Sequence, residues 1–178
     1  STCIGFGFAS SSSDNLRLAL TNIVEGSTSA LDSISMDSYD ADDLPDMISA
    51  IAGATTSALD NIAMTGFSAD ILPSLVGAVA GSITASLDEI TMTSYDHTDL
   101  TALISAATSG CTGALDNISL ADYNQSDLRE MVTNISKSAT SALGNISMTG
   151  YDASYLDDAV QAVTSGSISA CLLYTSDA

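Results

Sequence analysis

Apolar residues recur along the chain at the spacing of one face of an α-helix. In the segment from residue 98 to 125, the stripe of apolar residues runs from Leu100 to Ile118. These two residues are 18 positions apart, which is five turns of an α-helix. Matching stripes begin at Leu72 and Leu128. The pattern predicts one amphipathic helix of about 20 residues in each segment. In the segment from residue 98 to 125 the stripe consists of Leu100, Leu103, Ile104, Ala107, Cys111, Ala114, Leu115 and Ile118.

The stripe belongs to an internal repeat with a step of 28 residues. The register divides the chain into an apolar and Ser-rich segment (1–13), an array of five units and a partial sixth (14–170), and a tail outside the repeat (171–178). The tetrapeptide Ala-Leu-Asp-Ser at Ala30 returns in related form at Ala58, Ser86, Ala114 and Ala142. One aromatic residue per unit keeps the same step, at Tyr39, Phe67, Tyr95, Tyr123 and Tyr151.

Each predicted helix starts at a residue type that favours helix N-termini. We place the N-caps at one repeat position, because it holds Asp, Thr or Ser in every unit. This choice puts Pro45 and Pro73 in the first turn, where a missing N–H is tolerated. A start two residues earlier, at Asp40 and its equivalents, would move both prolines deeper into the helix, so we favour the later start. The predicted N-caps are Asp14, Asp42, Asp70, Thr98, Ser126 and Ser154.

The residues after each helix allow a second interpretation. Ile62-Ala63-Met64-Thr65 alternates apolar and polar residues after an Asp-Asn turn, as a short strand would. The spacing of Leu59, Ile62 and Met64 resembles the opening of a leucine-rich repeat, which implies an α/β solenoid, although Phe67 or a Tyr holds the family's Asn position. The helical phase continues through Ile62. We therefore predict an all-α solenoid or helical array, with an α/β solenoid as the alternative.

A single amphipathic helix cannot bury its own apolar stripe, so neighbouring repeats must stack. Antiparallel helices facing each other across a layer would form a continuous core. The residues beside the stripe are small, which lets helix axes approach toward the lower end of about 8–10 Å. Because Gly, Ser and Thr have low helix propensity, packing must hold these helices, and one isolated repeat should be unfolded. The small residues include Ala50, Gly53, Ala80, Gly81, Ala106 and Gly110.

Composition narrows the classes of partner. The chain has 178 residues, 22 acidic and 3 basic side chains and a net charge of −19, and 46% of its residues are hydrophobic. A disordered acidic tail would be less apolar. The charge excludes nucleic-acid binding through a basic patch and argues against docking on anionic lipid. The uncharged stretch 71–87 is shorter than the about 20 apolar residues of a membrane helix, so we predict a core helix and no integral membrane span.

Both ends of the chain depart from the repeat. The first nine residues (STCIGFGFA) are apolar, so we expect either the remnant of a secretion signal cleaved near Ala9 or a segment that packs on the first helix. At the other end Cys171 takes the Leu position of the repeat. The tail CLLYTSDA resembles the translated sequencing-adapter read-through of environmental transcript assemblies, which implies a non-native C-terminus. Cys3, Cys111 and Cys171 have no CxxC spacing and predict neither a disulfide framework nor a zinc site.

The sequence predicts no catalytic residue, no cofactor and no metal site. His97, the single His, takes a loop position held elsewhere by Ala or Gln, so we expect it to be solvated. Cys111 lies on the apolar stripe, so we expect a buried, unreactive thiol. The acidic loop Asp37–Asp43 is not repeated in the next unit, so we expect helix capping and solubility there rather than calcium binding.

Two further patterns concern modification and binding. Asn-x-Ser sequences occur at Asn117, Asn124, Asn134 and Asn145, and they would be glycosylation sites only in a secreted eukaryotic protein. Under the α/β alternative, small polar residues after each helix, such as Asn61 and Thr65, would align in a ladder that suits ice or a glycan.

The functional expectation follows from the repeat. We expect a non-enzymatic structural or adhesive scaffold or spacer that is secreted or held at the cell surface, with a binding module for calcium, ice or a glycan as the alternative. The acidic Ser/Thr/Gly-rich repeats resemble surface or secreted proteins of environmental bacteria, and this resemblance implies the location. We expect a protein or polymer partner, and self-association through the open ends of the array.

Overall fold

The computed structural model describes residues 9–34, 43–62, 67–68, 70–90, 97–118, 124–146 and 153–169. Six α-helices occupy these ranges: α1 (Ala9–Ser29), α2 (Asp43–Ala58), α3 (Ile71–Ser86), α4 (His97–Gly113), α5 (Gln125–Ala142) and α6 (Ala153–Ser169). Each of the first five continues into a short 3-10 turn, namely η1 (Ala30–Ser33), η3 (Leu59–Asn61), η4 (Leu87–Glu89), η5 (Ala114–Asn117) and η6 (Leu143–Asn145). The prediction of an all-α array of helices about 20 residues long is confirmed.

The described residues contain no strand, so the all-α prediction holds for them, whereas the residues after Ile62, Ile90 and Ile146 that would form the strands of the α/β alternative lie outside the described residues. Leu59, which would open a leucine-rich repeat, starts the 3-10 turn Leu59–Asn61, and Ile62 after this turn is extended (φ −88°, ψ 121°). The Ile62 N–H donates to the Leu59 carbonyl at 3.1 Å and so closes the turn. Ile90 and Ile118 end their units in the same way. The first residue of the alternating pattern, Ile62, therefore closes a tight helix end.

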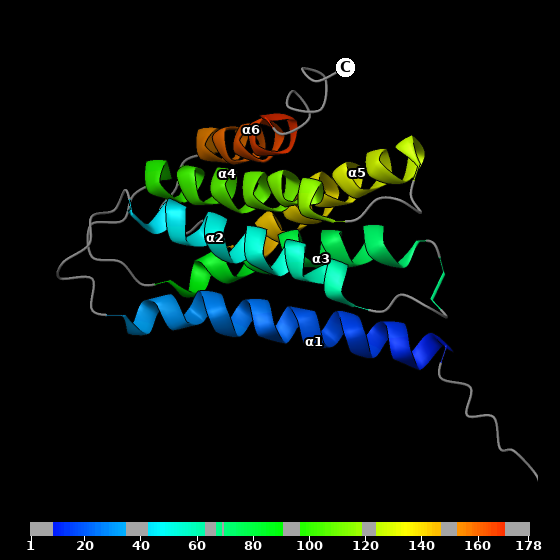
Figure 1. Cartoon of the computed structure of the whole chain (residues 1–178). Helices are drawn as coiled ribbons and strands as arrows, with labels where there is room; N and C mark the ends of the chain where they lie inside the picture. The colour runs from blue at the N-terminus through cyan, green and yellow to red at the C-terminus, as the bar shows by residue number, and fades with distance from the viewer. Residues whose placement is uncertain are drawn as a thin grey trace, which may run out of the picture.

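The helices stack in two layers (Figure 1). Helices α1, α3 and α5 lie side by side in one layer, and α2, α4 and α6 form the other. Successive helices run in opposite directions, as the stacking argument predicts. Every helix therefore packs mainly against the helix two units away and meets its sequence neighbours across the layers.

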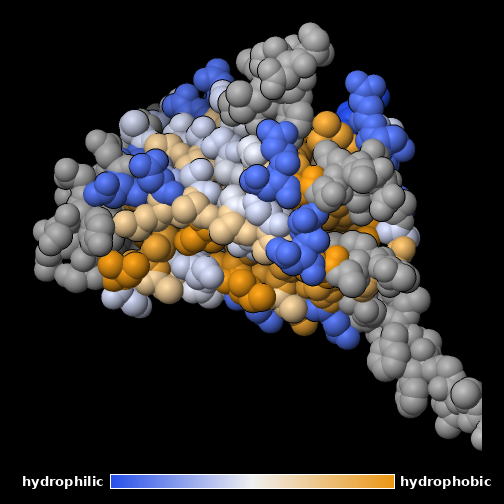
Figure 2. Space-filling view, viewed as in Figure 1, coloured by the Kyte–Doolittle hydropathy of each residue, from blue (hydrophilic) through white to orange (hydrophobic). Residues whose placement is uncertain are grey.

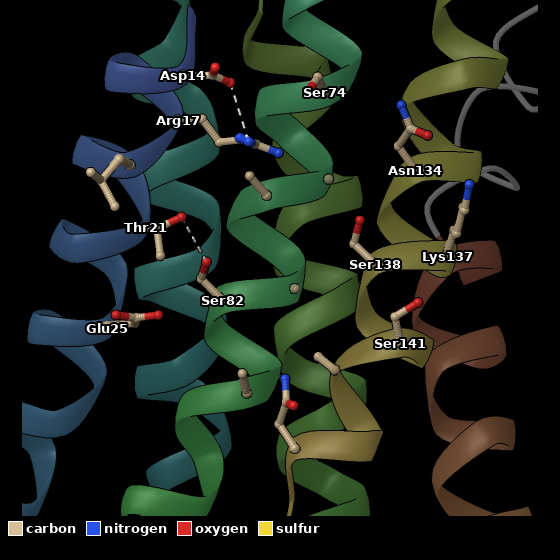
Figure 3. Close-up of a pocket in the computed structure, with 17 residues that line it drawn as sticks. Asp14, Arg17, Thr21, Glu25, Ser74, Ser82, Asn134, Lys137, Ser138 and Ser141 are labelled. Carbon is tan, nitrogen blue, oxygen red and sulfur yellow. Dashed lines mark hydrogen bonds and ion pairs between the residues drawn. The ribbon is translucent and has the colours of Figure 1, made fainter.

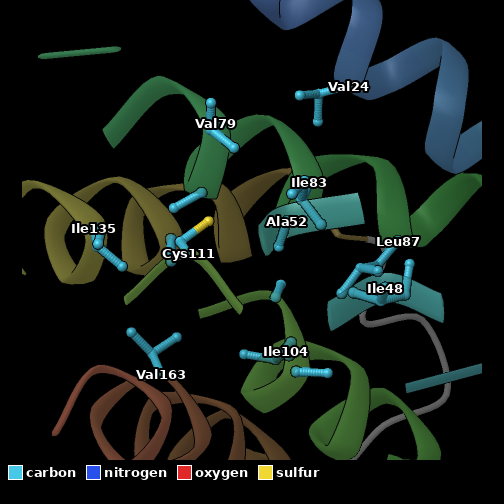
Figure 4. Close-up of a cluster of buried hydrophobic side chains, with 14 of the residues drawn as sticks. Val24, Ile48, Ala52, Val79, Ile83, Leu87, Ile104, Cys111, Ile135 and Val163 are labelled. Atoms are coloured by element: carbon cyan, nitrogen blue, oxygen red, sulfur yellow. The ribbon is translucent and has the colours of Figure 1, made fainter. Parts of the chain in front are cut away.

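One hydrophobic core lies between the layers and draws on all six helices (Figure 4). The stripe residues Ile48, Ile83, Ile104 and Ile135 are completely buried there. The 3-10 turns add Leu59, Leu87 and Leu115 and their equivalents. Because successive helices are antiparallel, the tetrapeptide that marks the repeat closes the core at both ends. Full burial of one such side chain is worth about 1.5–3 kcal/mol.

The predicted N-cap position is correct for α3, where Asp70 precedes the helix without a side-chain capping bond. It is wrong for α1, α4, α5 and α6, in which the predicted residues Asp14, Thr98, Ser126 and Ser154 lie inside the helix. Asp42 lies outside the described residues. In α5 the cap is Asn124, which accepts hydrogen bonds from the N–H groups of Ser126 (2.7 Å) and Asp127 (3.3 Å).

Proline explains why α2 and α3 begin at a later repeat position than the other helices. The helices α2 and α3 carry Pro45 and Pro73 at their third residue, and they begin two repeat positions later than α4, α5 and α6. Starting α2 or α3 two residues earlier would place proline at the fifth helical position, where a residue normally donates its N–H to the carbonyl four residues before and proline has no N–H to donate. Units without proline can use the earlier start, and in α5 a capping box is completed by Asp127, which accepts from the Asn124 N–H at 2.8 Å.

A polar contact recurs between units that are two steps apart. The Ser29 hydroxyl donates to the Glu89 carboxylate, and the Asn117 amide donates to the Ser57 hydroxyl at 3.2 Å. Both pairs are separated by 60 residues, so the same two repeat positions meet in each layer. Because these groups are exposed, each bond stabilises the stack only modestly, by about 0.5–1.5 kcal/mol.

Glycine allows the close approach of helices within a layer. A Cβ placed on Gly110 of α4 would lie 2.6 Å from the Ser49 carbonyl oxygen and 2.8 Å from the Ala52 Cβ of α2. A Cβ on Gly113, three residues later on the same helix, would meet no atom within 4 Å. The contact between α2 and α4 therefore needs a residue without a side chain at Gly110 but not at Gly113.

We predict that Gly110→Ala lowers the free energy of unfolding by about 1–2 kcal/mol, because backbone and Ala52 must move apart. The control Gly113→Ala should instead leave stability unchanged or raise it by up to about 1 kcal/mol, since Gly113 has α-helical dihedrals (φ −64°, ψ −27°). Urea denaturation of the two variants measures both changes. Equal effects of the two substitutions would contradict the proposed packing.

Candidate functional site

A polar groove lies on the outer face of the layer formed by α1, α3 and α5 (Figure 3). It encloses about 660 Å³. Its floor is α3, and α1 and α5 form the walls. The floor residues Ser74 to Ala85 span about 16 Å along the helix axis, which is long enough for an extended ligand.

The floor is flat because its side chains are small. A Cβ on Gly77 would lie 3.0 Å from the Asn134 Cβ, and a Cβ on Gly81 would lie 3.1 Å from the Ser138 Cβ. These two glycines let α3 and α5 approach closely, while Ala78 beside them is too short to fill the space above the floor. The groove is thus a consequence of the same packing that builds the layer.

The walls carry hydroxyl, amide and charged groups. On α1, Arg17 forms an ion pair with Asp14 at 3.3 Å and extends toward α3 (Figure 3). Ser82 on the floor donates a hydrogen bond to the Thr21 hydroxyl at 3.2 Å. Lys137 projects from the opposite wall. Two of the three basic side chains of an acidic protein therefore line one groove.

A smaller hollow repeats this arrangement on the outer face of the other layer. It lies between α4 and α6 and encloses about 430 Å³. Thr101 and Ser105 line it from α4, and Gln161 and Ser165 line it from α6. Both outer faces thus present shallow hollows lined by hydroxyl and amide groups, which can hydrogen-bond a polar ligand.

Of the residues that the sequence singled out, the structure describes only some. Cys111 is completely buried in the core, as predicted, and Figure 4 shows it among aliphatic side chains. The loop position expected for His97 is wrong, because His97 is the first residue of α4; its side chain lies outside the described residues. The acidic loop also lies outside them, except for Asp43 at the start of α2. Among the described residues no three His, Cys, Asp or Glu side chains could hold a metal ion together.

The four Asn-x-Ser sites differ in their surroundings. Asn134 lies beside Gly77 through its Cβ and carbonyl oxygen, and it lines the polar groove, so a glycan on its amide would occupy the groove. Asn117 donates its amide to Ser57, and Asn124 caps α5 through its carbonyl oxygen. Asn145 is exposed at the end of the groove. Whether any of them carries a glycan stays a prediction.

Sequence reasoning did not find the groove residues Arg17 and Lys137. They are far apart in the chain and occupy different repeat positions, so the period does not align them. The available signal was the scarcity of basic residues together with the small residues of α3, which the sequence analysis assigned only to helix packing.

The helical stretch Ile71–Glu89, which comprises α3 and η4, is long and apolar enough to cross a membrane by length and composition alone, and no other described helix is. Within its most apolar window 67% of the residues are buried inside the protein. A core helix meets the same criterion, and α3 is the central helix of its layer. Its burial gives no indication of a membrane span.

Comparison with models of known protein families found no match, and comparison with curated protein sequences found none either. The functional argument therefore rests on the groove, the core and the repeat.

The environment of Cys111 gives a prediction about reactivity and pH. Burial raises the pKa of the Cys111 thiol to about 12, and the neighbouring Thr56 hydroxyl lowers it by less. In the unfolded chain a thiol titrates near about 8.5, so above that pH only the unfolded state loses its proton. Stability should therefore fall by about 1.4 kcal/mol per pH unit between about pH 9 and the folded pKa.

The measurement compares the pH dependence of urea unfolding in a Cys3→Ser/Cys171→Ser background with that of the same protein carrying Cys111→Ala. The slope that belongs to Cys111 should vanish in the second protein, while the titration of Tyr and Lys is common to both. In the folded background protein a thiol reagent should modify Cys111 only after denaturant is added. Rapid modification without denaturant would show that the thiol is accessible.

Proposed function

We propose that this protein is a non-enzymatic structural scaffold or spacer, built to be extended by adding units, and that it acts outside the cell or at its surface. The observation that carries the proposal is the recurrence of one contact set between units two steps apart. The hydrogen bond between Ser29 and Glu89 recurs one unit later between Ser57 and Asn117. The close approach of Gly110 to the backbone of Ser49 recurs one unit later between Ser138 and Gly77.

A contact set that recurs can be continued without redesign of the core. Each added unit contributes one helix, whose stripe is covered by its neighbours, so stability grows with the number of interfaces. The length of the stack grows with it, at about 8–10 Å for each further helix in a layer. A spacer needs these two properties, and an acidic, Ser- and Thr-rich exterior suits an exposed location.

We predict that a second copy of residues 70–125, inserted after residue 125, extends the fold. The insertion adds one helix to each layer, so the dependence of the unfolding free energy on urea should rise by about one third, because it scales with the surface exposed. The longest dimension measured by small-angle X-ray scattering should grow by about 8–10 Å. The control is an insertion of the same 56 residues in scrambled order, which should act as a flexible loop. If both insertions behave alike, the units do not form an extendable array.

The groove favours a second function, binding of a glycan chain. Its polar floor, its length and its hydroxyl and amide walls suit an extended sugar polymer, and Arg17 and Lys137 on opposite walls would pair with carboxylate groups on it. This proposal needs an acidic polysaccharide, because a neutral one would offer no negative charge to Arg17 and Lys137.

We predict that an oligomer of a uronic acid binds the groove and that Arg17→Gln with Lys137→Gln weakens this binding at least tenfold. Arg129→Gln is the matched control, because it also removes a positive charge from α5 but lies outside the groove. Isothermal titration calorimetry with the oligomer, and with a neutral oligosaccharide of the same length, measures the affinities. Equal weakening by all three substitutions would indicate charge attraction without a binding site, and no saturable heat would remove the glycan proposal.

A further inference from the structure

The two ends of the stack expose apolar positions that the inner units bury. On α6, Leu156, Val160 and Ile168 are 49%, 40% and 50% exposed. Their equivalents two units earlier, Leu100, Ile104 and Thr112 of α4, are 5%, 0% and 0% exposed. These positions face the following units, so α6 presents a surface that is prepared for a further pair of helices.

The opposite end of the stack shows the complementary pattern. Ile23 of α1 is 58% exposed, whereas its equivalents Val79, Ala107 and Ile135 are completely buried. This repeat position faces the preceding units. Figure 2 shows apolar side chains on the surface of α1, along the lower edge of the view. The first helix therefore keeps the apolar surface of an inner helix although no described helix covers it.

Gly26 of α1 keeps the space that a neighbouring helix would need. A Cβ on Gly26 would meet no atom within 4 Å. Its equivalent Gly110 in α4 is pressed against the backbone of α2 at Ser49. The residue equivalent to Ser49 in α5 is Thr133, which is exposed. Gly26 and Thr133 thus hold the two repeat positions that contact each other between Gly110 and Ser49, but they lie at opposite ends of the stack.

Charge distinguishes the α5 end of the stack. Leu128 and Val132 line a groove of about 760 Å³ on the open side of α5, together with Arg129 and Lys137. Two of the three basic residues of the chain thus lie on the surface that faces the following units. A partner for this surface should be apolar along one stripe and acidic overall, and a second copy of this chain, with its net charge of −19, meets both conditions.

We propose that copies of this protein dock head to tail, with α1 of one copy packing on α5 of the next and α2 packing on α6. In this contact, α1 of one copy takes the place after α5 that α5 takes after α3, and α3 after α1, within one copy. Because the two faces differ, the contact is heterologous and leaves one open face at each end, so it produces a growing filament rather than a closed dimer. This inference rests on the proposed structural role and names its partner.

A disulfide experiment tests the orientation. In the full chain with Cys3→Ser and Cys171→Ser, one protein carries Gly26→Cys and another carries Thr133→Cys, while Cys111 stays buried. The Gly110 and Ser49 backbones approach closely enough for a disulfide at the equivalent pair. Mixing the two proteins with oxidised glutathione should give at least ten times more disulfide dimer than a matched mixture in which Gly113→Cys replaces Gly26→Cys. If the mixture gives no more disulfide dimer than the control mixture, the proposal is overturned. It is also overturned if either protein alone gives as much dimer as the mixture, because that would indicate a symmetric contact.

Sedimentation velocity tests the association without cross-links. The experiment uses the unmodified chain in 0.5 M NaCl, where repulsion between two acidic copies is screened over less than about 8 Å. The average mass should rise with concentration beyond that of two chains. Gly26→Trp should reduce the mass to that of a monomer, while Gly113→Trp should not, and both variants should keep the melting temperature of the parent because neither site has an atom within 4 Å.

A monomeric parent at all concentrations up to 1 mM, about the weakest affinity that a specific contact of this kind would have, would overturn the proposal. The insertion of residues 70–125 reports separately on the structural role. If the insertion extends the fold but the protein does not self-associate, the proposed scaffold role stands and the proposed filament is wrong. If the insertion does not extend the fold, the proposed scaffold role is itself wrong.

Discussion

The structure depends on the close approach of helices that are two units apart in the sequence. Gly110 lies against the α2 backbone, and Gly77 and Gly81 lie against α5. Larger residues at these positions would separate the helices within a layer, and the apolar stripes would then no longer meet across the two layers. The layer, the core, the flat floor of the groove and the open ends of the stack all follow from this one contact.

The same close packing explains how a core can contain so much threonine. Thr84 and Thr112 occupy one repeat position and are completely buried, and their hydroxyls donate to the carbonyls of Ala80 (2.9 Å) and Thr108 (2.8 Å) in their own helices. In these two helices the polar group is satisfied locally. Thr28 and Thr56 hold the same repeat position and are also completely buried, but their hydroxyls lack such a hydrogen bond. A buried hydroxyl without such a bond would cost about 1–3 kcal/mol. Buried threonine therefore fits a helix that relies on packing rather than on intrinsic propensity.

Much of this fold could be predicted from the sequence, because the period of the stripe and the period of the repeat are both properties of the chain. The helix starts could not, since two competing caps differ by two residues and only the position of Pro45 or Pro73 decides between them. The groove could not be predicted either. Arg17 and Lys137 lie on outward positions, where no hydrophobic pattern constrains the sequence, and they meet only because α1 and α5 flank α3.

Stacking also gathers charge. Asp32 and Asp88 are exposed at one repeat position in η1 and η4 of the same layer, and Asp60 and Asp116 hold that position in the other layer. At an axis spacing of about 8–10 Å, each pair of neighbouring carboxylates repels by about 0.5 kcal/mol in water, and salt reduces this further. One buried Leu or Ile per unit contributes several times as much in the favourable direction. The array can therefore carry a net charge of −19 because repulsion acts through water along its edges while the packing energy is gained inside.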